Sequence, residues 1–273
     1  MDEKYKLVQK TKAIDKTIIR IGDINIGDGS FIVIAGPCAV ESQEQIINIS
    51  YEMKESGANM LRGGVFKPRT SPYDFQGLGM EGIQFLLEAK DKTGLPVVTE
   101  ITDASQIDAL QNVDVLQIGT RNMQNYSLLK EVGQTRKPVI LKRGFASTIE
   151  EFLLSAEYIL MSGNENVILC ERGLRTFQQG TRYLLDFSSI PIIKEKTHLP
   201  IIVDPSHAAG RADLVGIFSE LAMVAGADGI IVEVHNEPSK ALCDGKQALS
   251  IREFNNMMKK LKKRYEFEMT QHA

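Results

Sequence analysis

Short apolar runs alternate along the chain with longer segments whose apolar positions recur every three or four residues. The runs show little polar alternation, which is typical of strands buried on both faces of a parallel sheet. Eight such strands are predicted, over residues 31–36, 59–63, 97–101, 114–119, 138–144, 166–173, 200–207 and 229–235. The remaining periodic segments predict helices over 44–57, 80–94, 104–111, 127–134, 148–163, 187–197, 214–227 and 246–265.

This alternation predicts an α/β fold with a parallel sheet, and eight repeating units favour a closed (β/α)8 TIM barrel over a doubly wound sheet. The length of 273 residues is close to the roughly 250 typical of that barrel. We therefore expect one catalytic domain over residues 1–273. Residues 1–30 are expected to form an N-terminal extension and a short β-hairpin, with a turn signal at Asp28-Gly29, that closes the N-terminal end of the barrel.

Composition narrows the class of function. A formal net charge of −3 gives no reason to expect a nucleic-acid partner. The polar N-terminus lacks the apolar region of a signal peptide, and no stretch of about eighteen apolar residues occurs, so we expect a cytoplasmic protein with no membrane partner. Three scattered cysteines do not form a disulfide framework.

Polar motifs follow the predicted strands one after another. GPC, RGG, TE, GTRN, KRG, ERG, DPSH and EVH all stand at or just beyond a strand end. Barrel enzymes build their active sites from the loops at the C-terminal ends of the strands. This placement predicts an enzyme.

A metal site is predicted where the first, seventh and eighth strands meet on closure of the barrel. Cys38, His207, Glu233 and Asp244 end these strands or follow them. A thiolate, an imidazole and two carboxylates suit Mn²⁺, Fe²⁺, Co²⁺ or Zn²⁺ better than Mg²⁺.

The other cysteines and histidines are expected to have structural roles, and a lone cysteine after a strand is itself more often a buried apolar residue than a ligand. Cys170 is expected in the core and Cys243 in loop packing. His198 and His272 are expected at the surface, and His235 behind the site or in a structural role.

Basic residues gather at the ends of the second, fourth, fifth and sixth predicted strands, where their mutual repulsion would be costly without bound anions. Arginine and the adjacent glycine turns suit phosphate and carboxylate, so at least one substrate is expected to be a phosphorylated acid. The loop KPRTSPYDFQGLG predicts a second phosphate site, and two anion sites beside one metal suggest condensation of two phosphorylated molecules. The basic residues are Arg62, Lys67, Arg69, Arg121, Lys142 and Arg172.

Long motifs carry a resemblance to a known family. IAGPCAVES, LRGGVFKPRTSPYDFQGLG, QIGTRNMQN, LKRG, ERGLRTF, DPSHAAGR and EVHNEPSKALCDGKQAL resemble 3-deoxy-7-phosphoheptulonate (DAHP) synthase of the compact class I-beta type, related to 3-deoxy-manno-octulosonate 8-phosphate (KDO8P) synthase. The resemblance covers about residues 15 to 262. It implies condensation of phosphoenolpyruvate with erythrose 4-phosphate and water, the first step of the shikimate pathway.

The resemblance also implies residue roles. Cys38, His207, Glu233 and Asp244 match the metal ligands of the family, and Arg69 and Thr70 match its sugar-phosphate site. Lys142, Glu100 and His207 are expected to take part in catalysis, with Glu100 handling the proton of the attacking water. The residues that match the phosphoenolpyruvate site are Arg62, Lys67, Arg121, Lys142 and Arg172.

Two alternatives remain open from the sequence. KDO8P synthase shares the expected fold and donor but uses arabinose 5-phosphate, and it typically carries KANRS where this chain has KPRTS. A catalytically dead barrel that serves as a binding partner is disfavoured by the complete set of metal-type and phosphate-type residues.

The family resemblance suggests an oligomeric state, and the length of the N-terminal segment suggests how the enzyme is regulated. The family usually forms dimers or tetramers, so a homo-oligomer is expected. Residues 1–30 are too few for the regulatory domain that some relatives carry. We therefore expect no inhibition by aromatic amino acids through such a domain.

Overall fold

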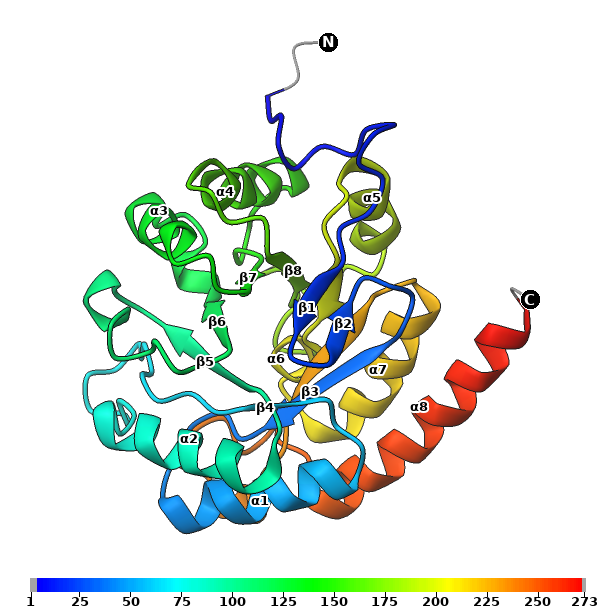
Figure 1. Ribbon diagram of the computed structural model, residues 1–273. Coiled ribbons are helices and arrows are strands. Elements are labelled where there is room, and N and C mark those ends of the chain that lie inside the picture. Colours follow the sequence, from blue (N-terminus) through cyan, green and yellow to red (C-terminus); the bar gives the residue numbers. More distant parts are fainter. Residues whose placement is uncertain (1–3, 272–273) are drawn as a thin grey trace.

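The computed structural model describes residues 4–271 and contains a closed barrel of eight parallel strands, as predicted (Figure 1). Each strand pairs with the next in chain order, and the last closes on the first with Gly229 opposite Ile32 and Glu233 opposite Gly36. The strands are β3 (Ile32–Gly36), β4 (Met60–Arg62), β5 (Val97–Ile101), β6 (Val115–Ile118), β7 (Val139–Lys142), β8 (Val167–Glu171), β9 (Ile201–Val203) and β10 (Gly229–Glu233).

Helices form the outer ring of the barrel, and their starts follow local capping chemistry. The Ser42 hydroxyl accepts from the Gln45 N–H at the start of α1, and Thr148 and Glu151 form a capping box at the start of α4. The α-helices are α1 (Gln43–Glu55), α2 (Met80–Thr93), α3 (Tyr126–Gln134), α4 (Ile149–Met161), α5 (Ser189–Lys196), α6 (Pro205–Ala209), α7 (Val215–Val224) and α8 (Ile251–Gln271). In residues 4–271, no helix is long and apolar enough to cross a membrane.

Two predicted helices differ from the structure. Residues 104–111 hold only the 3-10 turn η1 (Ala104–Gln106), which Asp103 caps. The last helix begins at Ile251 rather than at 246, because Leu249 extends the sheet beside β10: the Leu249 N–H donates to Glu233 O, and the His235 N–H donates to Leu249 O. Apolar spacing alone does not reveal these competing backbone hydrogen bonds.

The predicted strand over 200–207 is also shorter than expected, because the chain turns into α6 after Val203. Asp204 is the N-cap of α6, its carboxylate accepts from the His207 N–H, and Pro205 occupies the first turn. The Asp-Pro pair is a local start signal for a helix, and it was available in the sequence.

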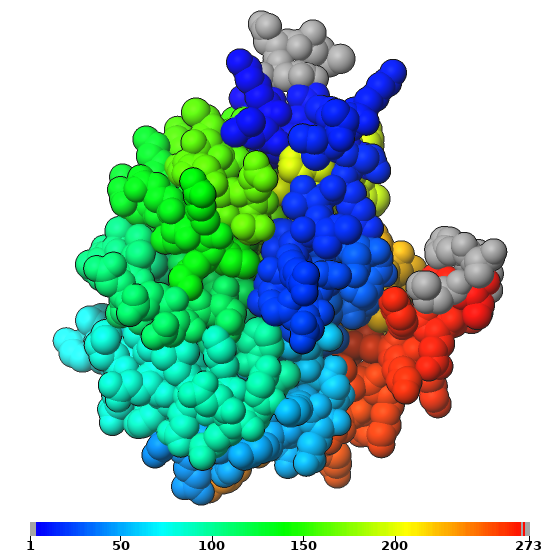
Figure 2. Space-filling model, viewed as in Figure 1, coloured from blue at the N-terminus to red at the C-terminus, as the bar shows by residue number. Residues whose placement is uncertain are grey.

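The N-terminal hairpin consists of β1 (Ile19–Ile21) and β2 (Ile24–Ile26), which pair antiparallel. Its turn lies at Gly22 and Asp23 rather than at the predicted Asp28-Gly29, which follows β2. Gly22 has a φ of 58°, which favours glycine. The hairpin lies in front of the barrel in Figure 1, and the N-terminal residues cover the centre of this face in Figure 2.

The hairpin closes the N-terminal end of the barrel, as predicted. Ile19, Ile21 and Ile26 belong to the apolar cluster that fills the barrel interior. Cys170 lies in the same cluster and is fully buried, so its predicted core position is confirmed. A second and larger cluster packs the strands against the outer helices.

The N-terminal segment before the hairpin is bound to the outside of the barrel. The Glu157 carboxylate accepts from the backbone N–H groups of residues 6, 7 and 8. His198 was expected at the surface and is instead buried: Nδ1 lies 2.7 Å from Thr17 Oγ1, and Nε2 lies 2.7 Å from Leu7 O. His272 lies outside the described residues.

We predict that Ile19→Ala lowers the free energy of unfolding by about 2–5 kcal/mol, because it leaves a cavity where the hairpin meets the barrel interior. The neighbouring Ile18 is 54% exposed, so Ile18→Ala is a matched control that should change stability by at most about 0.5 kcal/mol. Urea denaturation of both variants measures the difference. Equal effects would mean that the hairpin is not part of the core.

Candidate active site and metal centre

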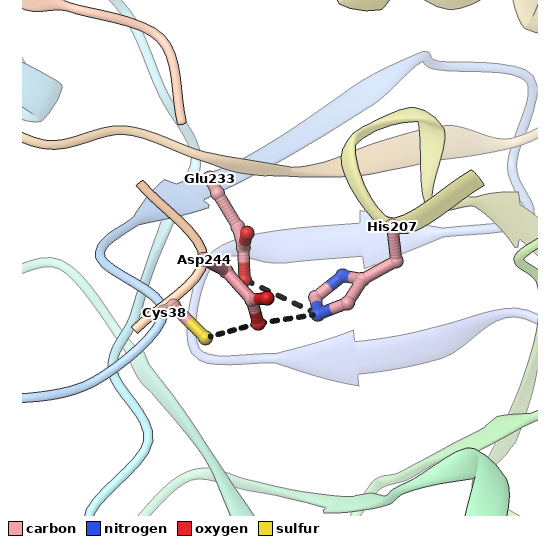
Figure 3. Close-up of side chains that lie close together, drawn as sticks. All are labelled: Cys38, His207, Glu233 and Asp244. Carbon is pink, nitrogen blue, oxygen red and sulfur yellow. Dashed lines mark hydrogen bonds and ion pairs between the residues drawn. The ribbon is translucent and has the colours of Figure 1, made fainter. Parts of the chain in front are cut away.

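Four ligand-type side chains meet at the C-terminal end of the barrel (Figure 3). One ligand atom from each of Cys38, His207, Glu233 and Asp244 lies within 4.8 Å of the others. His207 Nε2 is 3.2 Å from Glu233 Oε1 and 3.8 Å from Asp244 Oδ2, which in turn lies 3.2 Å from Cys38 Sγ. The structure thus brings together all four residues of the predicted metal site.

The ends of three neighbouring strands position this cluster. Glu233 is the last residue of β10, and Cys38 lies just beyond β3. Gly36, at the end of β3, allows the close approach of the next strand, because a Cβ there would lie 2.1 Å from Arg62 O. Asp244 has a φ of 53°, and Asp tolerates this left-handed conformation better than most residues. Its loop conformation directs the carboxylate toward the other ligands.

Asp204 orients the His207 ring. Its Oδ2 lies 2.7 Å from His207 Nδ1 and accepts a hydrogen bond from Lys142 Nζ. Burial alone would raise the pKa of Asp204, but the charges of His207 and Lys142 hold that pKa well below its usual value. Because Nδ1 faces this carboxylate, Nε2 is left for a ligand.

The donor set fits a first-row divalent ion. Glu233 Oε1 is buried and accepts no hydrogen bond from a described residue, although Arg62 Nη1 lies 2.9 Å away. A buried oxygen without a donor is costly unless a ligand satisfies it. One sulfur, one nitrogen and two carboxylates are the ligands that such ions accept.

Cys243 packs directly against Cys38. The two Sγ atoms of Cys38 and Cys243 are 3.0 Å apart, and Lys67 Nζ lies 3.2 Å from Cys38 Sγ. The Cys243 contact and burial raise the pKa of the Cys38 thiol, whereas the charge of Lys67 lowers it. Metal ligation would require the thiolate and would release this proton.

A polar cavity of about 220 Å³ opens beside the cluster. It collects the six predicted basic residues from the ends of β4, β6, β7 and β8, together with two of the metal-type residues, His207 and Asp244. Lining residues that the sequence analysis did not single out include Gln117, Phe145 and Arg182. The predicted residues in its wall are Arg62, Lys67, Arg69, Thr70, Glu100, Arg121, Lys142, Arg172, His207 and Asp244.

Carboxylates pair with Arg62, Lys142 and Lys67 at the cavity wall. Arg62 Nη1 lies 2.9 Å from Glu233, and Lys142 binds Asp204. Lys67 Nζ lies 4.0 Å from Glu100 Oε2. These pairs stabilise the charges before any substrate arrives.

Arg172 is the cation whose surroundings point most clearly to an anionic ligand. It is 3% exposed, and its Nε and Nη1 have no hydrogen-bond partner among the described residues. Its guanidinium lies 4.1 Å from the Tyr183 ring centroid and 5.2 Å from that of Phe145. Burial lowers the pKa of Arg172, and a bound phosphate or carboxylate would satisfy both free nitrogens.

Comparison with known proteins agrees with this site. The sequence profile of the DAHP synthetase I family matches residues 7–267. The chain belongs to the DAHP synthetase I family. A phospho-2-dehydro-3-deoxyheptonate aldolase of Thermotoga maritima is 53% identical over 260 residues, which are 95% of this chain and 77% of that relative.

Solved structures give the same family and fold. The crystal structure of Thermotoga maritima DAHP synthase has a TM-score of 0.93 at 52% identity and covers 96% of this chain and 77% of that one. A truncated form of the Thermotoga enzyme has a TM-score of 0.89 at 48% identity and covers 95% of both chains.

A second group of relatives carries another name. A 2-dehydro-3-deoxyphosphooctonate aldolase of Geobacter sulfurreducens is 32% identical, with 89% of this chain and 96% of that relative covered.

The loop after β4 meets the anion site at its rim. Thr70 Oγ1 accepts from Arg121 Nη2 at 3.2 Å, and Arg69 Nη2 lies 3.3 Å from Asp74 Oδ2. The structure therefore places Thr70 of the predicted sugar-phosphate site in contact with Arg121 of the predicted phosphoenolpyruvate site.

Glu100 depends on a glycine for its place in the wall. A Cβ at Gly119 would lie 1.9 Å from Glu100 Oε1. The strand-end glycine thus leaves the space that the carboxylate occupies, close to Lys67.

The sequence did not predict three residues that contact the ligand-type side chains. Asp204 carried a local signal in its Asp-Pro pair, whereas Arg182 and Gln247 carried none. Arg182 comes from the long loop between β8 and α5 and contacts Asp244 at 3.0 Å. Such contacts arise only when distant loops meet.

We predict that Cys38→Ser weakens metal retention, because thiolate is the softest of the four ligands. Cys170→Ser is the matched control: it should leave metal content unchanged, although it places a hydroxyl in the apolar interior. Metal analysis after gel filtration, together with Mn²⁺ titration of stripped protein, compares the two. Equal metal content in the wild type and Cys38→Ser would remove Cys38 from the site.

Proposed function

We propose that this protein condenses phosphoenolpyruvate with erythrose 4-phosphate and water to give 3-deoxy-D-arabino-heptulosonate 7-phosphate and phosphate. The observation that supports it most strongly is the position of buried Arg172, with two free nitrogens, in a cationic cavity beside the four ligand-type side chains. Membership of the family and the printed name of the Thermotoga relative agree with this reaction.

Cys38, His207, Glu233 and Asp244 would hold the divalent ion, which we expect to be Mn²⁺, Fe²⁺, Co²⁺ or Zn²⁺. When bound, such an ion supplies Lewis-acid polarisation of the sugar-phosphate aldehyde.

Phosphoenolpyruvate would bind deepest in the cavity. Its phosphate and carboxylate carry several negative charges, and Arg172 offers two unpaired donors at the wall. Arg121, Lys67, Lys142 and Arg62 surround the same space. Donors fixed in a buried site stabilise charge without reorganising at the moment of reaction.

Erythrose 4-phosphate would enter from the rim. Arg69 and Thr70 stand on the loop after β4, and Arg121 already contacts Thr70. Binding the sugar phosphate there would leave its aldehyde end directed toward the metal ligands. Arg69 could exchange its partner Asp74 for the phosphate, since that pair is partly exposed.

The chain's own residues would then manage proton transfer. The C2=C3 double bond of phosphoenolpyruvate would supply the electron pair for the bond between C3 and the aldehyde carbon, which leaves C2 electrophilic. Lys142, whose Nζ donates to Asp204, would give a proton to the aldehyde oxygen. Water adds to C2 and loses one proton to Glu100, which leaves a hydroxyl and the phosphate ester on the same carbon. The bond between C2 and the phosphate oxygen then breaks, the hydroxyl proton passes to the departing phosphate, and the ketone remains.

The competing substrate assignment is arabinose 5-phosphate. Relatives named 2-dehydro-3-deoxyphosphooctonate aldolase match this chain at 29–32% identity, against 53% for the Thermotoga heptonate enzyme. The KPRTS sequence of the rim loop favours erythrose 4-phosphate. The same loop is where the acceptor phosphate would bind, so it is the element expected to select the sugar.

We predict that phosphate is released from phosphoenolpyruvate with erythrose 4-phosphate but not with arabinose 5-phosphate. EDTA should abolish this release, and Mn²⁺ should restore it. A phosphate-release assay with each acceptor measures all of these outcomes. Equal activity in metal-stripped enzyme, or preference for arabinose 5-phosphate, would contradict the proposal.

We also predict that Arg69→Ala lowers kcat/KM for the sugar phosphate by about tenfold to a hundredfold, because it removes a charge-assisted contact worth roughly 1.5–3 kcal/mol. Phosphoenolpyruvate binding, measured by calorimetry, should change little. Arg20 lies in the hairpin at the other end of the barrel, so Arg20→Ala is the control. If Arg69→Ala instead lost only its binding of phosphoenolpyruvate, the assignment of the two substrates to the two anion sites would have to be exchanged.

A further inference from the structure

The two carboxylates of the metal cluster each direct one oxygen toward the other ligands. Asp244 Oδ2 lies 3.2 Å from Cys38 Sγ, and Glu233 Oε1 lies 3.2 Å from His207 Nε2. The remaining oxygens, Asp244 Oδ1 and Glu233 Oε2, accept hydrogen bonds from side chains outside the cluster. Each carboxylate therefore has an inner and an outer oxygen.

Arg182 and Gln247 supply these outer contacts as one connected unit. Arg182 Nη1 donates to Asp244 Oδ1 at 3.0 Å and to Gln247 Oε1 at 3.1 Å. Gln247 Nε2 donates to Glu233 Oε2 at 2.7 Å. Because both ends of the Gln247 amide are used, its orientation is determined by its two partners.

The backbone holds both residues in register with the cluster. Gln247 is 2% exposed, and its N–H donates to Asp244 O at 3.2 Å. The Arg182 N–H donates to Ala209 O at 3.0 Å, which binds its loop to α6, the helix that carries the histidine ligand. Gly210 leaves room for this contact, because a Cβ there would lie 2.4 Å from Arg182 Cβ.

We propose that Arg182 and Gln247 are positioning residues that form a carboxylate clamp, which restricts Asp244 and Glu233 to binding the metal through one oxygen each. This inference rests on the metal site of the proposed function. An outer oxygen that already accepts a hydrogen bond is withheld from the metal. Two monodentate carboxylates with one sulfur and one nitrogen leave a first-row ion able to accept a substrate oxygen, whereas two bidentate carboxylates would crowd it.

The two members of the clamp contribute differently. Gln247 is neutral, so its loss frees Glu233 and removes one acceptor of Arg182 without changing the charge of the site. Arg182 also carries a positive charge, which repels a metal ion bound nearby. Removing that charge would strengthen metal binding and would mask the weakening caused by the loss of orientation. Arg182→Lys keeps the charge but ends one bond earlier than arginine, so its nitrogen cannot take the position from which Nη1 reaches both Asp244 and Gln247. This variant therefore isolates the geometric contribution.

The test is a calorimetric titration, in which Mn²⁺ alone is added to the metal-free full-length protein and the Kd is measured. We expect Gln247→Leu to raise the Kd for Mn²⁺ by about tenfold to a hundredfold, as loss of a hydrogen bond to a metal ligand does. Arg182→Lys should raise it by about twofold to tenfold. The double variant should show less than the product of the two effects, because both remove the same unit.

The absorption spectrum of the Co²⁺ form reports geometry independently of affinity. In Gln247→Leu the freed Glu233 can bind through both oxygens, so we expect the visible d–d bands to weaken as the coordination number rises. With saturating Mn²⁺, kcat should fall more than the KM for either substrate rises, because the substrate contacts remain. Gln247→Leu changes a buried side chain and could melt below the assay temperature. In that case Arg182→Lys replaces it as the test variant, because the Arg182 side chain is partly exposed.

Arg211→Ala is the matched control, because Arg211 lies in the neighbouring loop and pairs with exposed Asp213 instead of a metal-site residue. Its Mn²⁺ affinity should equal that of the wild type. A raised KM for the sugar phosphate in Arg182→Lys, with unchanged metal affinity and Co²⁺ spectrum, would make Arg182 a substrate contact and overturn the clamp. If the wild type bound Mn²⁺ but condensed phosphoenolpyruvate with neither sugar phosphate, the proposed function would be overturned and the clamp would stand.

Discussion

The buried carboxylate of Asp204 joins the two halves of the site. It caps α6, lies 2.7 Å from His207 Nδ1 and accepts from Lys142 Nζ. Metal-type and anion-type residues are therefore linked by one charged group that is fully buried. Its removal would leave a lysine without its acceptor and a histidine free to turn, so one substitution would disturb both functions.

The barrel makes this concentration of charge possible. Its closure at β10 and β3 brings Cys38 and Glu233 together although they are far apart in the chain. Opposite charges alternate across the cavity wall, with Arg62 beside Glu233 and Lys142 beside Asp204. The cost of burying each charge is offset by a partner of opposite sign. Only Arg172 keeps two buried nitrogens without a hydrogen-bond acceptor among the described residues that line this cavity.

Stability and chemistry lie at opposite ends of the barrel. The hairpin seals the N-terminal end with Ile19, Ile21 and Ile26, while the long loops after the strands build the site at the other end. The site can therefore vary in its loops without loss of the core. The rim loop with Arg69 and Thr70 is one such element, and the Arg182 loop is another.

The sequence alone determined the strand order, the closed barrel, the meeting of four ligand-type side chains and the basic cavity, because burial on both faces and polar strand ends leave local patterns. Local patterns did not decide between competing hydrogen bonds. The hairpin turn at Gly22, the 3-10 turn after Asp103 and the late start of α8 depend on such competition. Only the tertiary structure decided that His198 is buried and that Arg182 and Gln247 meet the metal-type carboxylates. These contacts join loops that are distant in the chain, and no periodicity within one segment records them.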